Sequence, residues 1–264
     1  RQYPQSSPTS LPGIVALMTM NNQLTVRPVA TDIEAQETRR LLTEQIHARI
    51  EAPMPTGPVH DDGTLRPTLI GAWRDNRLTG AALIGPAIQA ARQMLAGQGT
   101  APGTYQAAQT IMRHVAMSEA IAVHPDHRHE GIGLEIKRFC DTWAARHQAH
   151  LVLSLATTPA ARALNEKAGH KTLEATVALV MQVVDQHQRP LHPAWAILRD
   201  QSQGLSLWTL LPLVQPQDTP LRVGQYRNEP GPGTRHPQGE PIEWISRRTD
   251  GTYTMRTEYM PRIR

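Results

Sequence analysis

The stretch IAVHPDHRHEGIGLEI, residues 121–136, joins an apolar run to a segment with helical spacing. Residues 114–123 have the composition of a strand, and residues 131–148 place their apolar side chains on one stripe of a helix. The connecting loop carries Arg128 and the pair Gly131 and Gly133. The start of a helix offers unpaired backbone N–H groups and a positive dipole end, and glycine lets a ligand approach the backbone. The stretch therefore predicts an anion site over residues 129–134.

Other readings of this loop fit less well. A Rossmann fingerprint requires a third glycine where Ile136 stands, and no Gly-Lys-Ser/Thr of a Walker loop follows. His124, His127 and His129 could be metal ligands, but only the neighbouring Asp126 or Glu130 could supply a carboxylate. We therefore expect no metal site and interpret the histidines as loop residues beside a bound phosphate.

The pattern around this loop predicts an α/β (α+β) fold. The order strand, glycine turn, helix, buried strand over residues 114–157 is typical of a right-handed βαβ unit with two parallel strands. The remaining expected elements are a strand and helix over 24–50, a loop over 51–67, a hairpin over 68–86 that turns at Asp75 and Asn76, a helix and then a glycine-rich loop over 87–110, a short helix over 158–169, and one long strand or two over 171–184.

The same stretch resembles the acyl-CoA signature of the GNAT superfamily of N-acetyltransferases. The matching residues are Ala122, Val123, Pro125, Arg128, Gly131, Ile132 and Gly133. Downstream, AARALNEKAGHKTLEA resembles the "AxxLYEKLGF" segment of that superfamily, and the similarity in element order extends over residues 24–184. The resemblance implies a mixed, mostly antiparallel central sheet with helices on both faces around the parallel βαβ unit.

The resemblance also implies a donor substrate, acetyl-CoA, and a primary amine as the acetyl acceptor. The CoA pyrophosphate would bind the loop amides and the pantetheine arm would lie beside the preceding strand. The implied donor-binding residues are Ile121, Ala122, Val123, Arg128, His129, Glu130, Gly131, Ile132, Gly133, Leu134, Thr158 and Asn165.

Two residues are implied to act in catalysis. Glu119 lies four residues before Val123 and is expected on the same strand face, where the superfamily often carries an acid; it is the candidate base that accepts the proton of the amine. Its alternative role is a solvated or ion-paired carboxylate, and His114 is a second candidate base. Asn165 occupies the usual position of a tyrosine that protonates the departing thiolate. Asn is not an acid, although its amide can donate a hydrogen bond.

The asparagine at the usual tyrosine position leaves two functions open. One is an N-acetyltransferase that works by direct attack of an amine of a small molecule, an aminoacyl-tRNA or a protein. The other is a catalytically weak acyl-CoA-binding or partner-binding module. A homodimer and a nucleic-acid contact by the C-terminal region are further open alternatives, although a net charge of +4 is too small for a dedicated nucleic-acid binder.

The chain divides into three predicted parts. Residues 1–20 are a Pro- and Ser-rich flexible leader, residues 21–184 the acyl-CoA-binding domain, and residues 185–264 a Pro-rich linker and β-rich extension. The extension contains a predicted hairpin over 242–260 with a type I′ turn at Asp250 and Gly251. The single cysteine, Cys140, excludes a disulfide framework, and the lack of a long apolar run predicts a cytoplasmic protein without a membrane span.

Overall fold

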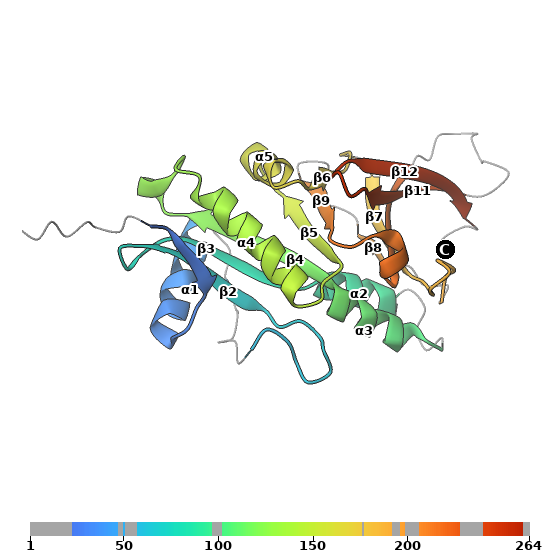
Figure 1. Cartoon of the computed structure of the whole chain (residues 1–264), viewed down its shortest axis with the longest axis horizontal. Helices are drawn as coiled ribbons and strands as arrows, with labels where there is room; N and C mark the ends of the chain where they lie inside the picture. Colours follow the sequence, from blue (N-terminus) through green and yellow to red (C-terminus); the bar gives the residue numbers. More distant parts are fainter. Residues whose placement is uncertain are drawn as a thin grey trace, which may run out of the picture.

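A computed structural model describes residues 23–46, 50, 57–96, 102–175, 177–191, 196–198, 206–227 and 240–260. The predicted leader lies outside these residues, as do residues 228–239 of the predicted extension. The described strands form two sheets (Figure 1). The first has the order β1 (Thr25–Pro28), β2 (Thr68–Arg74), β3 (Arg77–Pro86), β4 (Val115–Val123), β5 (Leu151–Ala156), β9 (Leu207–Pro212) and β6 (Lys171–Thr172). The second has the order β12 (Tyr253–Met260), β11 (Glu240–Arg247), β10 (Leu221–Arg227), β7 (Val177–Val183) and β8 (Ala196–Leu198).

The first sheet confirms the predicted fold class. Its neighbouring strands pair antiparallel except β4 with β5, which are parallel and joined by helix α4 (Ile132–Arg146). The predicted hairpin β2–β3 turns at Asp75 and Asn76, whose φ angles of 49° and 60° are the left-handed values of a type I′ turn.

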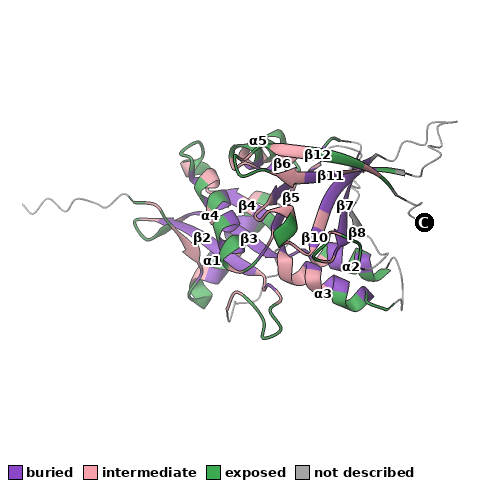
Figure 2. Ribbon diagram, turned by 45° about the vertical axis from the view of Figure 1, so that its right-hand side comes forward, coloured by how far each residue is buried: buried purple, intermediate pink, exposed green. Residues whose placement is uncertain are grey.

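Helices cover both faces of this sheet. On one face, α4 buries Ile132 and Ile136 against Ile84 and Val152, and α5 (Pro159–Lys167) contacts α4 and β5. On the other face, α1 (Asp32–Ile46) packs beside β2–β4, and α2 (Ile88–Ala96) and α3 (Thr104–His114) pack together beyond it. Figure 2 shows the buried strands between the half-exposed helices.

Each sheet contains strands from both sides of residue 184 in the sequence. β9, which follows this residue, lies between β5 and β6 of the first sheet, whereas β7, which precedes it, lies inside the second sheet and is buried along its whole length. One hydrophobic cluster contains Leu153 of β5, Leu179 of β7 and Ile245 of β11. The expected division at residue 184 therefore does not separate two cores, because apolar faces from both parts bury one another.

Two local predictions were wrong. Residues 104–110 belong to helix α3 and not to a glycine-rich loop, because the helix begins directly after Gly103, whose φ is 86°. The hairpin β11–β12 exists, but its turn is not type I′, since only Gly251 and not Asp250 has a positive φ. Gly251 N–H donates to the Arg248 carbonyl at 3.0 Å, and the Asp250 carboxylate accepts from Thr252 N–H at 2.9 Å. The Asp250 side chain thus stabilises a wider turn.

Candidate active site

Two residues of the loop between β4 and α4 have left-handed backbone conformations. After the short helix η1 (Pro125–His127), His129 and Gly131 have φ angles of 67° and 80°, and α4 begins at Ile132 with Gly131 as its N-cap. An ideal Cβ on Gly131 would meet no atom within 4 Å, so this bend opens toward free space. A side chain at Gly131 would be strained because L-residues disfavour this φ.

The second half of this loop presents amides that have no acceptor among the described residues. Within the described residues, the five consecutive N–H groups from His129 to Gly133 donate no hydrogen bond, and intrahelical bonds start with Leu134 and Glu135 to the Gly131 carbonyl. Five free donors at the positive end of a 15-residue helix form the kind of site that binds phosphate groups. The loop therefore has the free donors that the predicted anion site requires.

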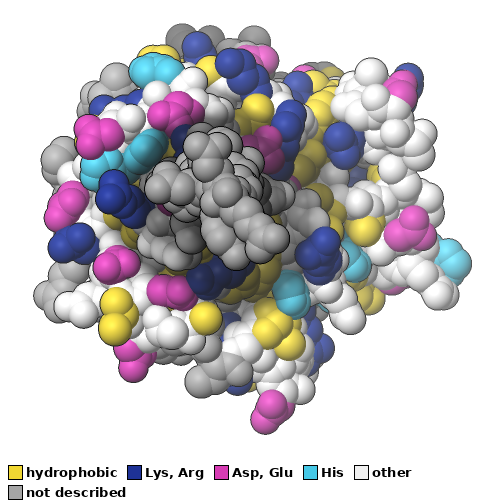
Figure 3. Space-filling model, turned by 60° about the vertical axis from the view of Figure 1, so that its left-hand side comes forward, with side chains coloured by type: hydrophobic (Ala, Val, Ile, Leu, Met, Phe, Trp, Pro, Cys, Tyr) yellow, Lys and Arg dark blue, Asp and Glu magenta, His cyan; other side chains and the backbone are white. Residues whose placement is uncertain are grey.

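Charged side chains lie around this loop. Arg74 of β2 pairs with Glu130 and holds the pKa of that carboxyl below its ordinary value, and His127 lies 3.4 Å from the same carboxylate. Arg128 reaches α1, where it donates to Gln45 at 2.6 Å. Figure 3 shows cationic, acidic and histidine side chains interspersed on the face it presents. Arg74 neutralises the one acid in the open amide run, so Glu130 does not oppose an anion there.

Strands β4 and β5 separate beside this loop. Their parallel pairing ends at Ser118 and Ser154, whereas β4 continues to Val123 while paired only with β3. The predicted strand residues Ile121, Ala122 and Val123 all lie beyond that point. Val123 also lies over Gly133, whose ideal Cβ would be 3.5 Å from a Val123 methyl. The opening between the strands therefore leads to the free amides of α4.

Glu119 occupies a β-bulge at the start of this opening. Leu83 of β3 pairs with Ala120 and Ile84 with Ser118, so Glu119 has no partner on β3. The extra residue reverses the alternation of β4: Met117 packs on the side of α2, and Ile121 and Val123 pack on the side of α4. The expectation that Glu119 shares a face with Val123 was therefore wrong, because the bulge places its side chain beside Met117.

Glu119 lines a cavity of about 420 Å³ between α2 and the first sheet. The cavity wall also includes Leu153 and Leu155 of β5 and, from the C-terminal part of the chain, Leu198 and Trp208. Glu119 is reached by solvent through the cavity, yet the surrounding protein desolvates its carboxyl and raises its pKa. No described residue forms an ion pair with it, which argues against the ion-paired alternative.

The second predicted catalytic residue is buried. Asn165 donates from Nδ2 to Thr209 Oγ1 at 3.0 Å, Thr209 donates to the Ser154 carbonyl at 3.3 Å, and Ser154 donates to the Ser118 carbonyl at 3.1 Å. This chain of hydrogen bonds ties α5 and β9 to the point where β4 and β5 separate. The Asn165 amide is thus already engaged in positioning these strands.

The remaining predicted residues are more dispersed. Thr158 is the N-cap of α5, and its hydroxyl accepts from Ala161 N–H at 3.1 Å. Leu134 lies in the first turn of α4 and is half-buried. His114 ends α3, before β4, and its ring stacks on that of His150 at 4.3 Å. It therefore lies at the opposite end of β4 from the opening and is not a base for this site.

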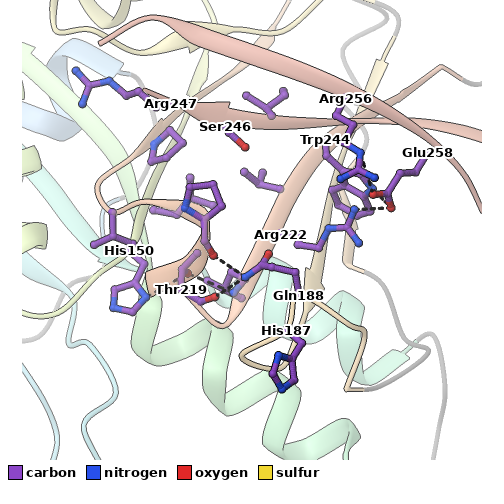
Figure 4. A pocket seen from close by; sticks show the side chains of 17 residues that line it. His150, His187, Gln188, Thr219, Arg222, Trp244, Ser246, Arg247, Arg256 and Glu258 are labelled. Atoms are coloured by element: carbon purple, nitrogen blue, oxygen red, sulfur yellow. Dashed lines mark hydrogen bonds and ion pairs between the residues drawn. The ribbon is translucent and has the colours of Figure 1, made fainter. Parts of the chain in front are cut away.

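A second cavity, of about 380 Å³, lies between the first residue of β5 and strands β10–β12 (Figure 4). Two of its charged groups, Arg222 and Glu258, are paired: the Arg222 guanidinium stacks 4.1 Å above Trp244 and donates to Glu258 at 2.5 Å. Burial, together with His114, lowers the pKa of His150 to about 4 and keeps its ring neutral at pH 7. This cavity lies away from the strand opening and does not belong to the site.

Three residues of the site region were not expected from the sequence. Arg74 is the last residue of the hairpin strand β2, and Leu198 and Trp208 lie in the region expected to be an extension. The spacing of Arg74 from the loop, 56 residues before Glu130, carries no local signal. The apolar run around Trp208 does indicate a buried strand, but nothing in it specifies pairing with β5.

The sequence profile of the acetyltransferase (GNAT) family matches residues 36–170, just over half of the chain. The chain belongs to the GNAT acetyltransferase family. The family assignment confirms the predicted superfamily and identifies the chain as an acetyltransferase. The match contains the loop of free amides, the bulge at Glu119 and the buried Asn165, but it ends before β7. A search of curated proteins found no match.

Solved structures similar to this GNAT acetyltransferase include three acetyltransferases. A putative acetyltransferase from Salmonella typhimurium, solved with acetyl-CoA, has 14% identity and a TM-score of 0.40 over 73% of this chain and 95% of its own. An acetyltransferase from Bacillus subtilis in complex with CoA has 13% identity and 0.40 over 73% and 100%. A polyamine N-acetyltransferase from Drosophila melanogaster has 15% identity and 0.41 over 72% and 100%.

Other kinds of site are less evident in the part of the chain that the structure describes. No three His, Cys, Asp or Glu side chains there are grouped so that they could hold a metal ion. None of the described helices combines the length and hydropathy that a membrane span requires.

Proposed function

We propose that this protein transfers the acetyl group of acetyl-CoA to the primary amine of a small molecule. The observation that carries the proposal is the run of free amides from His129 to Gly133, which opens toward the gap between β4 and β5. Acetyl-CoA consists of a pyrophosphate-bearing end and a thin arm, which fit an anion site followed by a gap between strands. The cavity beside Glu119 is within the range of about 300–1,000 Å³ that is usual for small ligands.

The chemistry follows from the position of Glu119. An ammonium entering the cavity loses a proton to the Glu119 carboxylate, and the neutral amine attacks the carbonyl carbon of the thioester. The resulting oxyanion would be stabilised by a backbone N–H of β4 on the edge that lacks a strand partner. Collapse of the tetrahedral intermediate breaks the carbon–sulfur bond, and the products are an amide and CoA.

The thiolate of CoA needs less help from a proton donor to leave than an alkoxide would. A thiol has an ordinary pKa near 8.5, so the thiolate can leave without full protonation. After collapse the nitrogen carries two protons, and one of them passes to the departing thiolate or to solvent to give the neutral amide, while Glu119 returns its own proton to solvent. Asn165 contributes in this scheme by fixing α5 and β9 around the opening, through its hydrogen bond to Thr209.

The proposal is tested by incubating the protein with acetyl-CoA and a panel of primary amines. We expect release of free thiol that depends on both substrates, with an N-acetylated product of the correct mass. The alternative function, an acyl-CoA-binding module, predicts binding of CoA by calorimetry without thiol release for any amine. Failure to bind CoA at all would contradict both functions.

The donor site is tested by Gly131→Ala. We expect the dissociation constant for CoA to rise by about tenfold, because the new Cβ enters the open bend and the φ of 80° becomes strained by about 1–2 kcal/mol. Gly63→Ala is a matched control, since Gly63 has a φ of 82° but lies in another loop. Both variants should lose similar stability. If both change CoA binding equally, the bend at Gly131 is not the donor site.

A further inference from the structure

The cavity beside Glu119 has one acidic group and an apolar wall. Among the described residues that line it, Glu119 is the only carboxylate, and Arg92 of α2 is the only cation. The rest of the described lining is mostly apolar and includes Met117, Leu155 and Trp208, with Gln89 and Thr157 as its uncharged polar side chains. An ammonium bound at Glu119 is therefore paired with a carboxylate, whereas a second ammonium elsewhere along the described lining has no anion to pair with.

We infer that the acceptor is a monoamine with an apolar body, and that diamines and polyamines are excluded. The inference rests on the proposed function and specifies its substrate class. Leaving a cation unpaired beside apolar side chains is unfavourable, because the lost hydration is not replaced. Arg92 adds repulsion toward a second positive charge at the same cavity. The apolar body of a monoamine instead gains from contact with Leu155 and Trp208.

The C-terminal part of the chain takes part in this selection. Leu198 and Trp208 line the cavity and are themselves buried, at 2% and 4% exposed, within the cluster that joins both sheets. Their placement depends on the return of β9 into the first sheet beside β5. The residues after 184 thus complete the acceptor site from the side of β5.

The experiment compares n-hexylamine with 1,6-diaminohexane, which have the same length and differ by one ammonium. With acetyl-CoA and thiol detection at pH 7.5, we expect kcat/KM for the monoamine to be at least about tenfold higher. Equal or better use of the diamine would overturn the inference and leave the proposed function intact. No acetylation of any amine, with CoA still bound, would overturn both.

A negative charge introduced into the cavity wall should shift the preference from the monoamine toward the diamine. Leu155 is only half-buried, and Leu155→Asp supplies the missing anion, so we expect the ratio of the two kcat/KM values to move by at least about tenfold toward the diamine. Leu155→Asn is the matched control: it has nearly the same shape and polarity without the charge, and should leave the ratio within about threefold. An unchanged ratio in a folded Leu155→Asp variant would show that the acceptor does not use this cavity.

Discussion

Replacing Glu119 by Gln is expected to lower kcat for amine acetylation by about 10²-fold or more, because a positioned general base contributes about 10²–10⁴-fold. The change removes the proton acceptor but keeps the size and the bulge. The KM for acetyl-CoA should stay nearly constant, since Glu119 lies on the side of α2 and not at the loop of free amides. The measurement is steady-state kinetics with thiol detection.

The pH profile gives an independent readout of the same residue. Burial raises the pKa of Glu119 above its ordinary value, so the base form appears only above that raised pKa. Activity should therefore rise with pH through the raised pKa, and this limb should vanish in Glu119→Gln. Glu44→Gln, on the exposed face of α1, is the matched control and should change neither kcat nor the profile. A Glu119→Gln variant with kcat within about twofold of the parent would exclude Glu119 as the base.

Replacing Asp141 by Asn is expected to destabilise the fold by about 3–5 kcal/mol, with a fall in Tm of about 10 °C. Asp141 of α4 is 7% exposed and accepts from Lys137 Nζ at 2.9 Å and from His170 Nε2 at 3.1 Å. Burial alone would raise the pKa of Asp141, but His170 and Lys137 together lower it below its ordinary value. Without this carboxylate, the fully buried ammonium of Lys137 has no counter-ion among the residues that the structure describes.

The double variant Lys137→Met with Asp141→Asn separates this cause from a packing defect. Removing both charges should recover most of the lost stability, because no unpaired buried charge remains. Thermal unfolding of the two single variants and the double variant gives the coupling free energy. Additive losses would show that the pair is not coupled. The expected result would assign the network of Lys137, Asp141 and His170 to anchoring α4, the helix that carries the free amides.

Local patterns were sufficient for the donor side of the site. The loop from His129 to Gly133 is contiguous, and a strand, two glycines and an amphipathic helix restrict its geometry strongly. The hairpin at Asp75 and Asn76 was equally predictable, because both residue types tolerate the left-handed φ that a two-residue turn requires. In both places the determining interactions lie within a few residues of one another.

The acceptor side could not be predicted in this way. Glu119 was predicted from its position on the strand, but the direction of its side chain depends on a bulge that arises from pairing with β3, about 35 residues earlier in the chain. Asn165 was selected by its place in a motif, whereas its actual partner, Thr209, lies 44 residues later. Side-chain direction and hydrogen-bond partners are set by neighbours that sequence spacing does not reveal.

The sequence alone determined the parallel βαβ unit, the glycine loop that opens helix α4 and the superfamily, because these depend on short-range periodicity and glycine placement. Only the tertiary structure decided that β9 returns to pair with β5, that β7 leaves for a second sheet, and that Leu198 and Trp208 wall the cavity of Glu119. Strands β7 and β9 are both apolar and would fit either sheet. Their assignment depends on which buried faces become complementary once the whole chain packs.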